Sequence, residues 1–244
     1  MTRPAVQLKG LGYAYPDGTR ALDGIDLAVR PGERVALIGP NGAGKTTLML
    51  HLNGLAHPTS GSVEIDGMPV SKANLDEVRQ RVGFLFQDPD DQLFMPTVYD
   101  DVAFGPRNLG LNGDEIERRV RGALRHVGMA GSEDRMPHHL SFGERRRVAL
   151  ATVLAMSPQM LALDEPSSNL DPRGRRALIN LLAGLDATLL VATHDLELAL
   201  ELCERSVLLD GGRLIADGST REIVSDDRLT TEHGLEVPPS LRPR

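Results

Sequence analysis

Residues 39–47, Gly39-Pro40-Asn41-Gly42-Ala43-Gly44-Lys45-Thr46-Thr47, restrict the possible folds of this chain more than any other segment. They have the pattern G-x-x-x-x-G-K-[ST], in which a glycine-rich turn surrounds phosphate groups with backbone N–H groups. The apolar run 35–38 before them predicts a buried strand, and residues 48–52 after them predict a helix that ends near Asn53-Gly54. A strand, a glycine-rich turn and a helix in this order predict a nucleotide-binding α/β fold.

Lys45 and Thr46 give this phosphate loop its expected chemistry. The Lys45 ammonium would neutralise the β- and γ-phosphates of a nucleotide, and the Thr46 hydroxyl is placed to ligate Mg²⁺. Glycines lack the Cβ atoms that would block a close backbone approach, and the N-terminus of the following helix also attracts anions. The loop predicts nucleotide binding, but by itself it does not indicate which reaction follows.

Composition limits the remaining possibilities. The 244 residues, 41% of them hydrophobic, are enough for one large domain, and we expect one with an inserted lobe. The net charge of −7 argues against a protein that wraps nucleic acid, because such proteins present a basic surface.

The single cysteine, Cys203, lies in an apolar helical pattern and is expected in the core. No apolar run reaches the roughly 18 residues that span a bilayer, and residues 1–4 do not resemble a signal peptide. Work at a membrane would therefore need a partner chain.

Apolar patterning divides the rest of the chain into three blocks. The first, residues 6–87, is expected to be mainly strands, at 6–8, 22–29, the hairpin arm 61–67 and 82–86. The second, from 97 to about 137, is expected to be short helices, with Thr97 as an N-cap and a helix over 114–127. The third has the expected order helix 144–156, strand 160–163, helix 173–185, strand 188–193, helix 196–203 and strand 206–209. This alternation predicts an α/β fold with a parallel sheet and a helical lobe inserted into it.

Polar residues follow three further expected strands. Asp164 and Glu165 come directly after an apolar strand; Asp164 would support the Mg²⁺ shell and Glu165 would polarise an attacking water. His194 and Gln87 also stand at strand ends. A lone histidine or glutamine is more often structural than catalytic. A catalytic role for these two residues is therefore indicated only because the chain also has a phosphate loop. Ligands collect at the ends of parallel strands, which is where these residues are expected to stand.

A second anion site is indicated by the turn Leu140-Ser141-Phe142-Gly143-Glu144, which precedes an arginine-rich helix. A serine hydroxyl and a glycine amide at a helix N-terminus can bind phosphate. One phosphate loop does not need such a turn within its own subunit. The turn makes sense if two copies face each other and each contributes it to the nucleotide of the other, with residues 167–172 crossing the interface.

These motifs together resemble those of the ABC-type ATPases, the nucleotide-binding subunits of ATP-driven transporters. The resemblance runs from about Val6 to Val224. It implies a P-loop NTPase (RecA-like) core with an antiparallel β subdomain and an inserted α-helical subdomain at about 90–157, all within residues 1–235. It also implies ATP and Mg²⁺ as cofactors. Residues 236–244, with three prolines, are expected to be a poorly ordered tail.

Carried over position by position, the resemblance assigns a role to each motif. Residues 39–47 become the Walker A loop, residues 140–144 the signature turn and 168–171 the D-loop. Catalytic roles are implied for Glu165 as the base, His194 as the switch histidine and Gln87 as the Q-loop glutamine. Coordination of Mg²⁺ is implied for Thr46, Gln87 and Asp164. Nucleotide contacts are implied for Tyr15, which would stack on adenine, and for Gly39, Pro40, Asn41, Gly42, Ala43, Gly44, Lys45, Thr46, Thr47, Ser141, Gly143, Glu144 and Asp171.

The signature turn departs from the family pattern at two positions. Phe142 replaces the usual first glycine, and Glu144 replaces the usual glutamine. The family's phosphate contacts are carried by Ser141 and Gly143, which are retained, so we expect function to survive. Glu144 also suits a helix N-terminus.

Residues 86–94 and 97–106 resemble one branch of that family, the energy-coupling factor transporters and especially their cobalt/nickel-type ATP-binding subunits. This resemblance implies an importer at the cytoplasmic face of the cell membrane, with the chain bound peripherally. The implied partners are a second ATPase subunit, identical or paralogous, a transmembrane coupling subunit and a substrate-binding membrane subunit. Leu93, Phe94 and Phe104 would line the groove for a coupling helix, or would belong to the core of the helical lobe. Cobalt or nickel is the first expected cargo and a vitamin the second.

Two other functions compete with transport. A soluble ABC protein acting on nucleic acid or ribosomes would usually carry a long coiled coil or a second ATPase unit, and the sequence shows neither. A nucleotide-gated scaffold without turnover conflicts with the presence of both Glu165 and His194.

Overall fold

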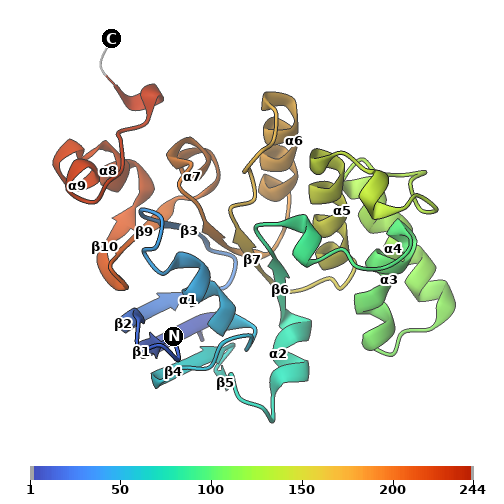
Figure 1. The fold of residues 1–244 in the computed structure, drawn as a ribbon, viewed down its shortest axis with the longest axis horizontal. Coiled ribbons are helices and arrows are strands. Elements are labelled where there is room, and N and C mark those ends of the chain that lie inside the picture. The colour runs from blue at the N-terminus through green and yellow to red at the C-terminus, as the bar shows by residue number, and fades with distance from the viewer. Residues whose placement is uncertain (1–2, 243–244) are drawn as a thin grey trace.

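The larger of two β-sheets forms the centre of the molecule (Figure 1). In the computed structural model, which describes residues 3–242, its strand order is β10-β9-β3-β8-β7-β6. The strands are β3 (Arg34–Ile38), β6 (Val82–Leu85), β7 (Met160–Asp164), β8 (Thr188–Ala192), β9 (Arg205–Asp210) and β10 (Arg213–Ser219). All neighbours pair in parallel except β9 and β10, which are antiparallel. The α/β fold with a parallel sheet is therefore confirmed.

Burial on both faces explains why the central strands are nearly continuous apolar runs. Every residue of β6, β7 and β8 is buried, as expected where helices cover both sides of a parallel sheet. Alternate residues of β3 enter two different cores. Ala36 and Ile38 belong to one cluster, and Val35 and Leu37 belong to the other.

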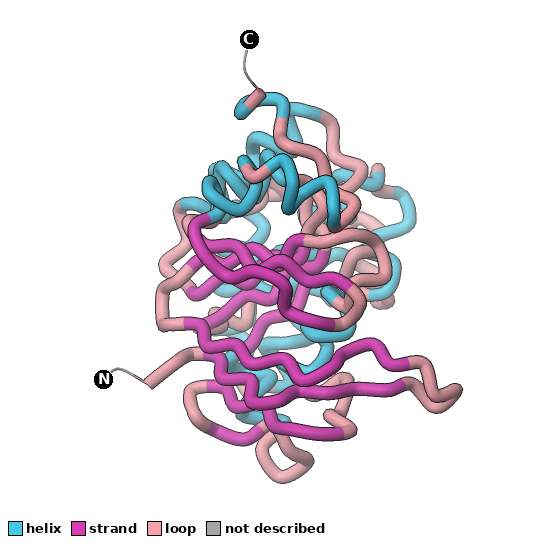
Figure 2. Tube along the Cα trace, turned by 90° about the vertical axis from the view of Figure 1, so that its left-hand side faces the viewer, coloured by secondary structure: helices cyan, strands magenta, loops and turns pink. Residues whose placement is uncertain are grey.

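The smaller sheet is antiparallel and forms a second layer (Figure 2). Its strand order is β2-β1-β4-β5. The strands are β1 (Val6–Ala14), β2 (Arg20–Val29), β4 (Ser60–Ile65) and β5 (Met68–Pro69). The predicted hairpin arm at 61–67 is confirmed as β4 with its turn into β5. Helix α1 (Lys45–Leu52) shares one core cluster with this sheet and with one face of β3.

The inserted lobe lies between β6 and β7 and is helical. It consists of η1 (Pro89–Asp91), α3 (Val98–Asn108), α4 (Gly113–His126), η2 (Pro137–His139) and α5 (Phe142–Leu154). The expected N-cap at Thr97 is confirmed, because its hydroxyl accepts a hydrogen bond from the Asp100 amide at 3.1 Å. Within residues 3–242, no helix combines the length and the apolar character needed to cross a bilayer.

Several elements differ from the sequence prediction. The predicted helices near 173–185 and 196–203 are present as α6 (Pro172–Ala183) and α7 (Leu196–Leu202). The prediction missed β10 and three short helices, α2 (Leu75–Arg81), α8 (Thr220–Ser225) and α9 (Asp227–Glu232). These helices have six or seven residues, too few for a helical repeat of apolar positions to stand out. In β10 no residue is buried, and the sequence Arg-Leu-Ile-Ala-Asp-Gly-Ser does not alternate apolar with polar residues.

The C-terminal segment, expected to be poorly ordered from residue 236 onward, has a defined course as far as Arg242. It contains η3 (Pro239–Leu241). Ser240 donates from its amide and its hydroxyl to the Glu197 carboxylate, at 2.9 and 2.8 Å. These side-chain contacts to α7 could not be read from a proline-rich composition. Residues 243–244 of the expected tail lie outside the described residues.

Cys203 is a core residue, as predicted. It is buried beside helix α7, and burial raises the pKa of its thiol to about 12. A thiol with such a pKa stays protonated and is a poor nucleophile.

Gly83 in β6 provides a test of how the helical lobe packs on the sheet. A Cβ atom at this position would lie 2.3 Å from Cγ1 of Val153 in α5 and 2.8 Å from Cγ of Pro158. We expect Gly83→Ala to lower the free energy of unfolding, measured in urea, by about 1–3 kcal/mol because the core is overpacked. The control is Gly122→Ala in α4, where nothing lies within 4 Å and the helix should gain about 0.5–1 kcal/mol. Equal effects of the two variants would contradict this account of the packing.

Candidate active site

Four neighbouring parallel strands bring the predicted site residues to one edge of the large sheet. The order β3-β8-β7-β6 places their C-terminal ends side by side. These ends continue into the phosphate loop after β3, His194 after β8, Glu165 after β7 and Gln87 after β6. The structure therefore brings together residues that are up to 155 positions apart (194 − 39).

The phosphate loop has a conformation that its glycines make possible. Gly39, Gly42 and Gly44 have φ angles of 147°, 79° and 101°, in a region that residues with a Cβ rarely occupy. A Cβ on Gly39 would lie 2.0 Å from the carbonyl oxygen of Leu209, and one on Gly44 would lie 2.7 Å from that of Ala21. The loop thus fits tightly against the neighbouring backbone, and Gly44 is the N-cap of α1.

Lys45 is held by the loop that it follows. Its Nζ atom donates to the carbonyl oxygens of Gly39 at 2.7 Å and Pro40 at 2.9 Å. Burial lowers the pKa of this ammonium, while the charges of Glu165 and Asp164 act in the opposite direction. The arrangement keeps a positive charge at the mouth of the loop, where a polyphosphate would need it.

Asp164 fits a divalent cation. Its side chain is 2% exposed, and its Oδ1 atom has no hydrogen-bond partner among the described residues. Burial raises the pKa of this carboxyl, and the Thr46 hydroxyl is the largest influence that lowers it. Carboxylate and hydroxyl oxygens are the hard ligands that Mg²⁺ prefers. A buried oxygen without a partner is costly, and a bound Mg²⁺ would remove that cost.

Glu165 is fixed by groups at the end of β8. Its Oε1 atom accepts from the His194 amide at 3.0 Å and lies 2.8 Å from His194 Nδ1, while Oε2 accepts from the Thr193 hydroxyl at 3.2 Å. The backbone of Glu165 has φ 45°, in the left-handed region. Such strain in a non-glycine residue is often found at functional sites. The His194 ring is mostly exposed, so it can face a ligand.

Tyr15 and Gln87 are the two remaining residues expected in the site. The Tyr15 hydroxyl is 2.9 Å from Thr47 Oγ1, and its ring is 42% exposed. The small sheet therefore presents an aromatic face beside the phosphate loop. Gln87 is exposed, and its backbone carbonyl accepts a hydrogen bond from Arg146.

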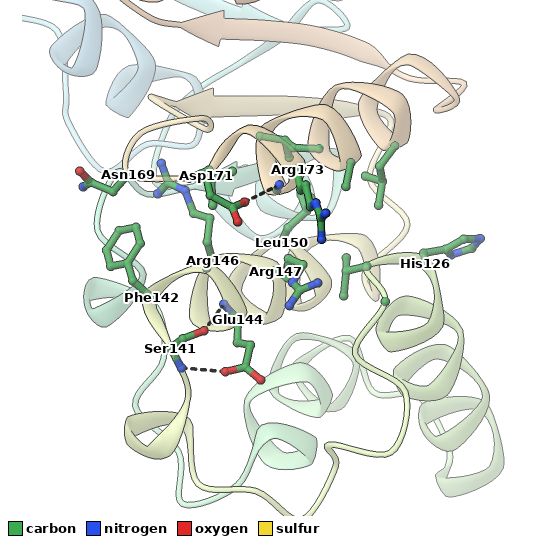
Figure 3. Close-up of a pocket in the computed structure, with 18 of the residues that line it drawn as sticks. His126, Ser141, Phe142, Glu144, Arg146, Arg147, Leu150, Asn169, Asp171 and Arg173 are labelled. Carbon is green, nitrogen blue, oxygen red and sulfur yellow. Dashed lines mark hydrogen bonds between the residues drawn. The ribbon is translucent and has the colours of Figure 1, made fainter.

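The signature turn is the N-terminus of α5 and is closed by a capping box (Figure 3). The Ser141 amide donates to Glu144 Oε2 at 2.8 Å, and the Glu144 amide donates to Ser141 Oγ at 3.3 Å. The Ser141 amide and then the Arg135 guanidinium, 2.9 Å away, lower the pKa of Glu144 to about 2. The suitability of Glu144 for a helix N-terminus is thus confirmed, and this carboxylate stays ionised at neutral pH.

The signature turn and the phosphate loop line different cavities. A cavity of about 790 Å³ between α5 and α6 is lined by the signature turn and by Asp171, the N-cap of α6 (Figure 3). Another, of about 490 Å³, is lined by residues 39–41 of the phosphate loop and by His194. Figure 1 likewise shows α1 and α5 well apart. The structure therefore does not bring Ser141, Gly143, Glu144 and Asp171 to the phosphate loop of the same chain.

Arg146 and Thr193 are site residues whose roles the sequence did not indicate. A signal for Arg146 was available: the apolar residues Ala149, Leu150 and Val153 stand three, four and seven positions after it, which places Arg146 on the buried face of its helix. Because Arg146 stands between two other arginines, the segment 145–147 looks like an exposed, charged part of the helix. The Thr193 hydroxyl becomes significant only through its contact with Glu165, which no local pattern reveals.

A family model for ABC transporters matches residues 22–168, more than half of the chain. The chain belongs to the ABC transporter family. This ABC ATPase is 58% identical over 244 residues to a Streptomyces avermitilis protein named for the same family, covering 100% of the chain and 93% of the relative. It is 52% identical over 238 residues to the energy-coupling factor transporter ATP-binding protein EcfA of Methanothermobacter thermautotrophicus, covering 96% of the chain and 76% of the relative.

Two solved structures are similar to this ABC ATPase over most of its length. CbiO1 from Clostridium perfringens, described as part of the ABC transporter complex CbiONQ, has a TM-score of 0.82 and 38% identity, with 94% of each chain covered. The dimeric cassette MJ0796 bound to ADP and Pi has a TM-score of 0.80 and 28% identity, covering 88% of this chain and 99% of that chain. These likenesses confirm the P-loop NTPase fold, and the family establishes ATP hydrolysis coupled to transport as the activity.

His51 offers a test of how α1 is packed behind the phosphate loop. The residue is fully buried; its Nδ1 atom lies 2.7 Å from the Thr47 carbonyl oxygen, and its Nε2 atom has no partner among residues 3–242. Burial lowers the pKa of this imidazole below its ordinary value of 6.5. The folded state therefore holds the neutral ring, while the unfolded state takes up a proton as the pH falls through about 6.5.

We expect the free energy of unfolding to decrease below pH 6.5, with a contribution from His51 of up to about 1.4 kcal/mol per pH unit. Urea unfolding of the wild type and His51→Gln between pH 5 and 8 measures it. The two curves should run parallel above pH 7, and the variant should lose less stability toward pH 5. Parallel curves over the whole range would contradict the assignment of a neutral buried His51.

Proposed function

We propose that this ABC ATPase is the ATP-binding subunit of an energy-coupling factor importer and works as a dimer. The main support for a dimer is that the signature turn and the phosphate loop of one chain line different cavities. Each chain holds half of two pockets, and a second copy, or a paralogous ATPase, supplies the missing half. The dimeric state of the MJ0796 cassette supports this arrangement.

Nucleotide binding closes the pair. The phosphate loop and Lys45 of one subunit hold the ATP polyphosphate, and the Tyr15 ring stacks on its base. Ser141 and Gly143 of the other subunit then contact the γ-phosphate through a hydroxyl and a helix N-terminus. Because the complete pocket exists only in the dimer, binding energy favours association.

Hydrolysis follows from the groups around the γ-phosphate. Glu165, as a general base, orients and polarises the attacking water, and His194, whose Nδ1 is 2.8 Å from Glu165 Oε1, keeps that carboxylate aimed at it. Thr46, Gln87 and Asp164 would hold Mg²⁺, which supplies charge neutralisation for the phosphates. Loss of the γ-phosphate removes the contact that joins the two subunits, and the dimer reopens.

Coupling to a membrane subunit takes place at the helical lobe. Phe94 is 63% exposed and Phe104 41% exposed, and their rings meet edge to face with centroids 5.0 Å apart. An exposed aromatic pair suits the apolar side of a docking helix. Leu93 is partly buried and packs against the core cluster that includes the helical lobe. Gln87, at the start of the lobe, reports nucleotide occupancy to the docked subunit.

The resemblance of residues 86–94 and 97–106 to the cobalt/nickel-type branch supports cobalt or nickel ion as the cargo, with a vitamin as the second candidate. The cargo is selected by a separate membrane protein, and the ATPase is held peripherally at the cytoplasmic face of the membrane. The subunits that co-purify with the chain identify the transporter.

Replacing the base tests the proposed hydrolysis. Glu165→Gln keeps the shape of the side chain but removes its basicity, so we expect phosphate release to fall by at least about 10²-fold while ATP binding is retained. The variant should accumulate as a closed dimer with ATP in size-exclusion chromatography. Glu117→Gln, on the surface of α4, is the matched control and should hydrolyse ATP at the wild-type rate. Undiminished phosphate release from Glu165→Gln would refute the proposed base.

Replacing the exposed aromatic pair tests the proposed docking. The double variant Phe94→Ala, Phe104→Ala should lose at least about tenfold in its recovery with the membrane subunits, because a central aromatic anchor contributes 2 kcal/mol or more to an interface. Leu55→Ala, which truncates an apolar residue after α1 whose exposed fraction, 49%, lies between those of the two phenylalanines, is the control and should co-purify normally. Normal recovery of the double variant would place the docking surface elsewhere.

A further inference from the structure

Arg146 is a fully buried arginine whose guanidinium joins two loops of the active site. It belongs to α5, five residues after Ser141, and is 1% exposed. Nη1 donates to the carbonyl oxygens of Phe86, at 2.9 Å, and Gln87. Nε donates to the carbonyl oxygen of Pro166, at 3.1 Å, and Nη2 donates to that of Glu165. In Figure 3 the side chain extends from α5 toward the segment that leads into α6.

The four hydrogen bonds divide between the two sides of one planar group. One side serves the loop after β6, which carries Gln87, and the other serves the loop after β7, which carries Glu165. These strands are neighbours in the sheet, with Leu85 paired to Leu163. Because the guanidinium is rigid, the distance between the two loops cannot change unless hydrogen bonds to Arg146 break.

The cost of burying this cation indicates that it does more than fill space. Burial lowers the pKa of Arg146, and the charges of Asp164 and Glu165 oppose that shift. All four of its direct acceptors are neutral backbone carbonyls. An apolar residue in its place would leave these four carbonyl oxygens without a donor, which is costly in a buried site. The burial of this cation is therefore tied to holding the two loops.

Both sides of the Glu165 backbone are held in place. Its amide donates to the Ala192 carbonyl oxygen at 2.8 Å, and its carbonyl oxygen accepts from Arg146. Between these contacts the residue has the unfavourable φ of 45°. The helix that begins with the signature turn thus helps to determine where the Glu165 carboxylate points.

We propose that Arg146 is a positioning residue that links the signature helix to Glu165 and Gln87 of its own chain. This proposal rests on the proposed function, in which the signature turn contacts the nucleotide bound by the other subunit. When the signature turn contacts that nucleotide, the position of α5 is fixed. Arg146 then fixes the position of Glu165, the proposed general base of its own subunit. Occupancy of one pocket then adjusts hydrolysis in the other.

Arg146→Lys and Arg146→Gln test the link in the full-length chain. Lysine keeps the charge but donates from a single nitrogen, so it cannot reach both loops. Glutamine can donate to only one loop. For both variants we expect kcat for ATP to fall at least tenfold, KM to stay within about threefold of the wild type, and the Hill coefficient for ATP to fall toward one. The control is Arg121→Gln on α4, whose side chain is 62% exposed and which should change none of these values.

Two results would overturn the proposal. One is a wild-type kcat and Hill coefficient in both variants. The other is a parallel loss of melting temperature and of affinity for a non-hydrolysable ATP analogue in both variants, which would assign Arg146 to folding alone. Glu165→Gln, assayed alongside, distinguishes a failure of the Arg146 link from a failure of the proposed function. If that variant is inactive while the Arg146 variants are normal, only the link fails; if it is fully active, the proposed function fails.

Discussion

The parallel pairing of β3, β8, β7 and β6 is the constraint on which the active site depends. Parallel strands point their carboxyl ends the same way, so the loops that leave them share one edge of the sheet. The register is fixed because both faces of these strands are buried, and a slip by one residue would turn every side chain into the wrong core. The spacing of the phosphate loop, Glu165, His194 and Gln87 is therefore a property of the sheet.

Four charged side chains are buried at this edge of the sheet. Lys45 and Arg146 are cations, Asp164 and Glu165 are potential anions, and all four are at least nine-tenths buried. The two cations are satisfied by backbone carbonyls, and Glu165 by the end of β8. Of these four groups, only Asp164 keeps a buried side-chain oxygen without a hydrogen-bond partner within residues 3–242. The site is thus organised before a nucleotide arrives, which reduces the reorganisation needed at the moment of reaction.

Much of this site could be predicted because its residues follow apolar strands in recognisable patterns. The turn at 39–47 and the pair Asp164-Glu165 each stand directly after a run of apolar residues, where local sequence and tertiary position coincide. The order of the strands was not predictable, since β3 lies between β8 and β9, which are more than 140 residues away. The burial of Arg146 could have been inferred from the apolar residues that follow it on the same helix face, but its role could not, because its acceptors are backbone carbonyls. The hydrogen bonds of Ser240 could not be predicted for a similar reason, because they depend on Glu197 in a distant helix.

The division of β3 between two cores has a mechanical consequence. Because Ala36 and Ile38 pack on one side and Val35 and Leu37 on the other, the strand cannot shift without disturbing both halves of the molecule. The phosphate loop therefore starts from a stationary anchor. A displacement of β3 during the ATPase cycle would require both cores, the one shared with the small sheet and the one shared with the helical lobe, to repack together.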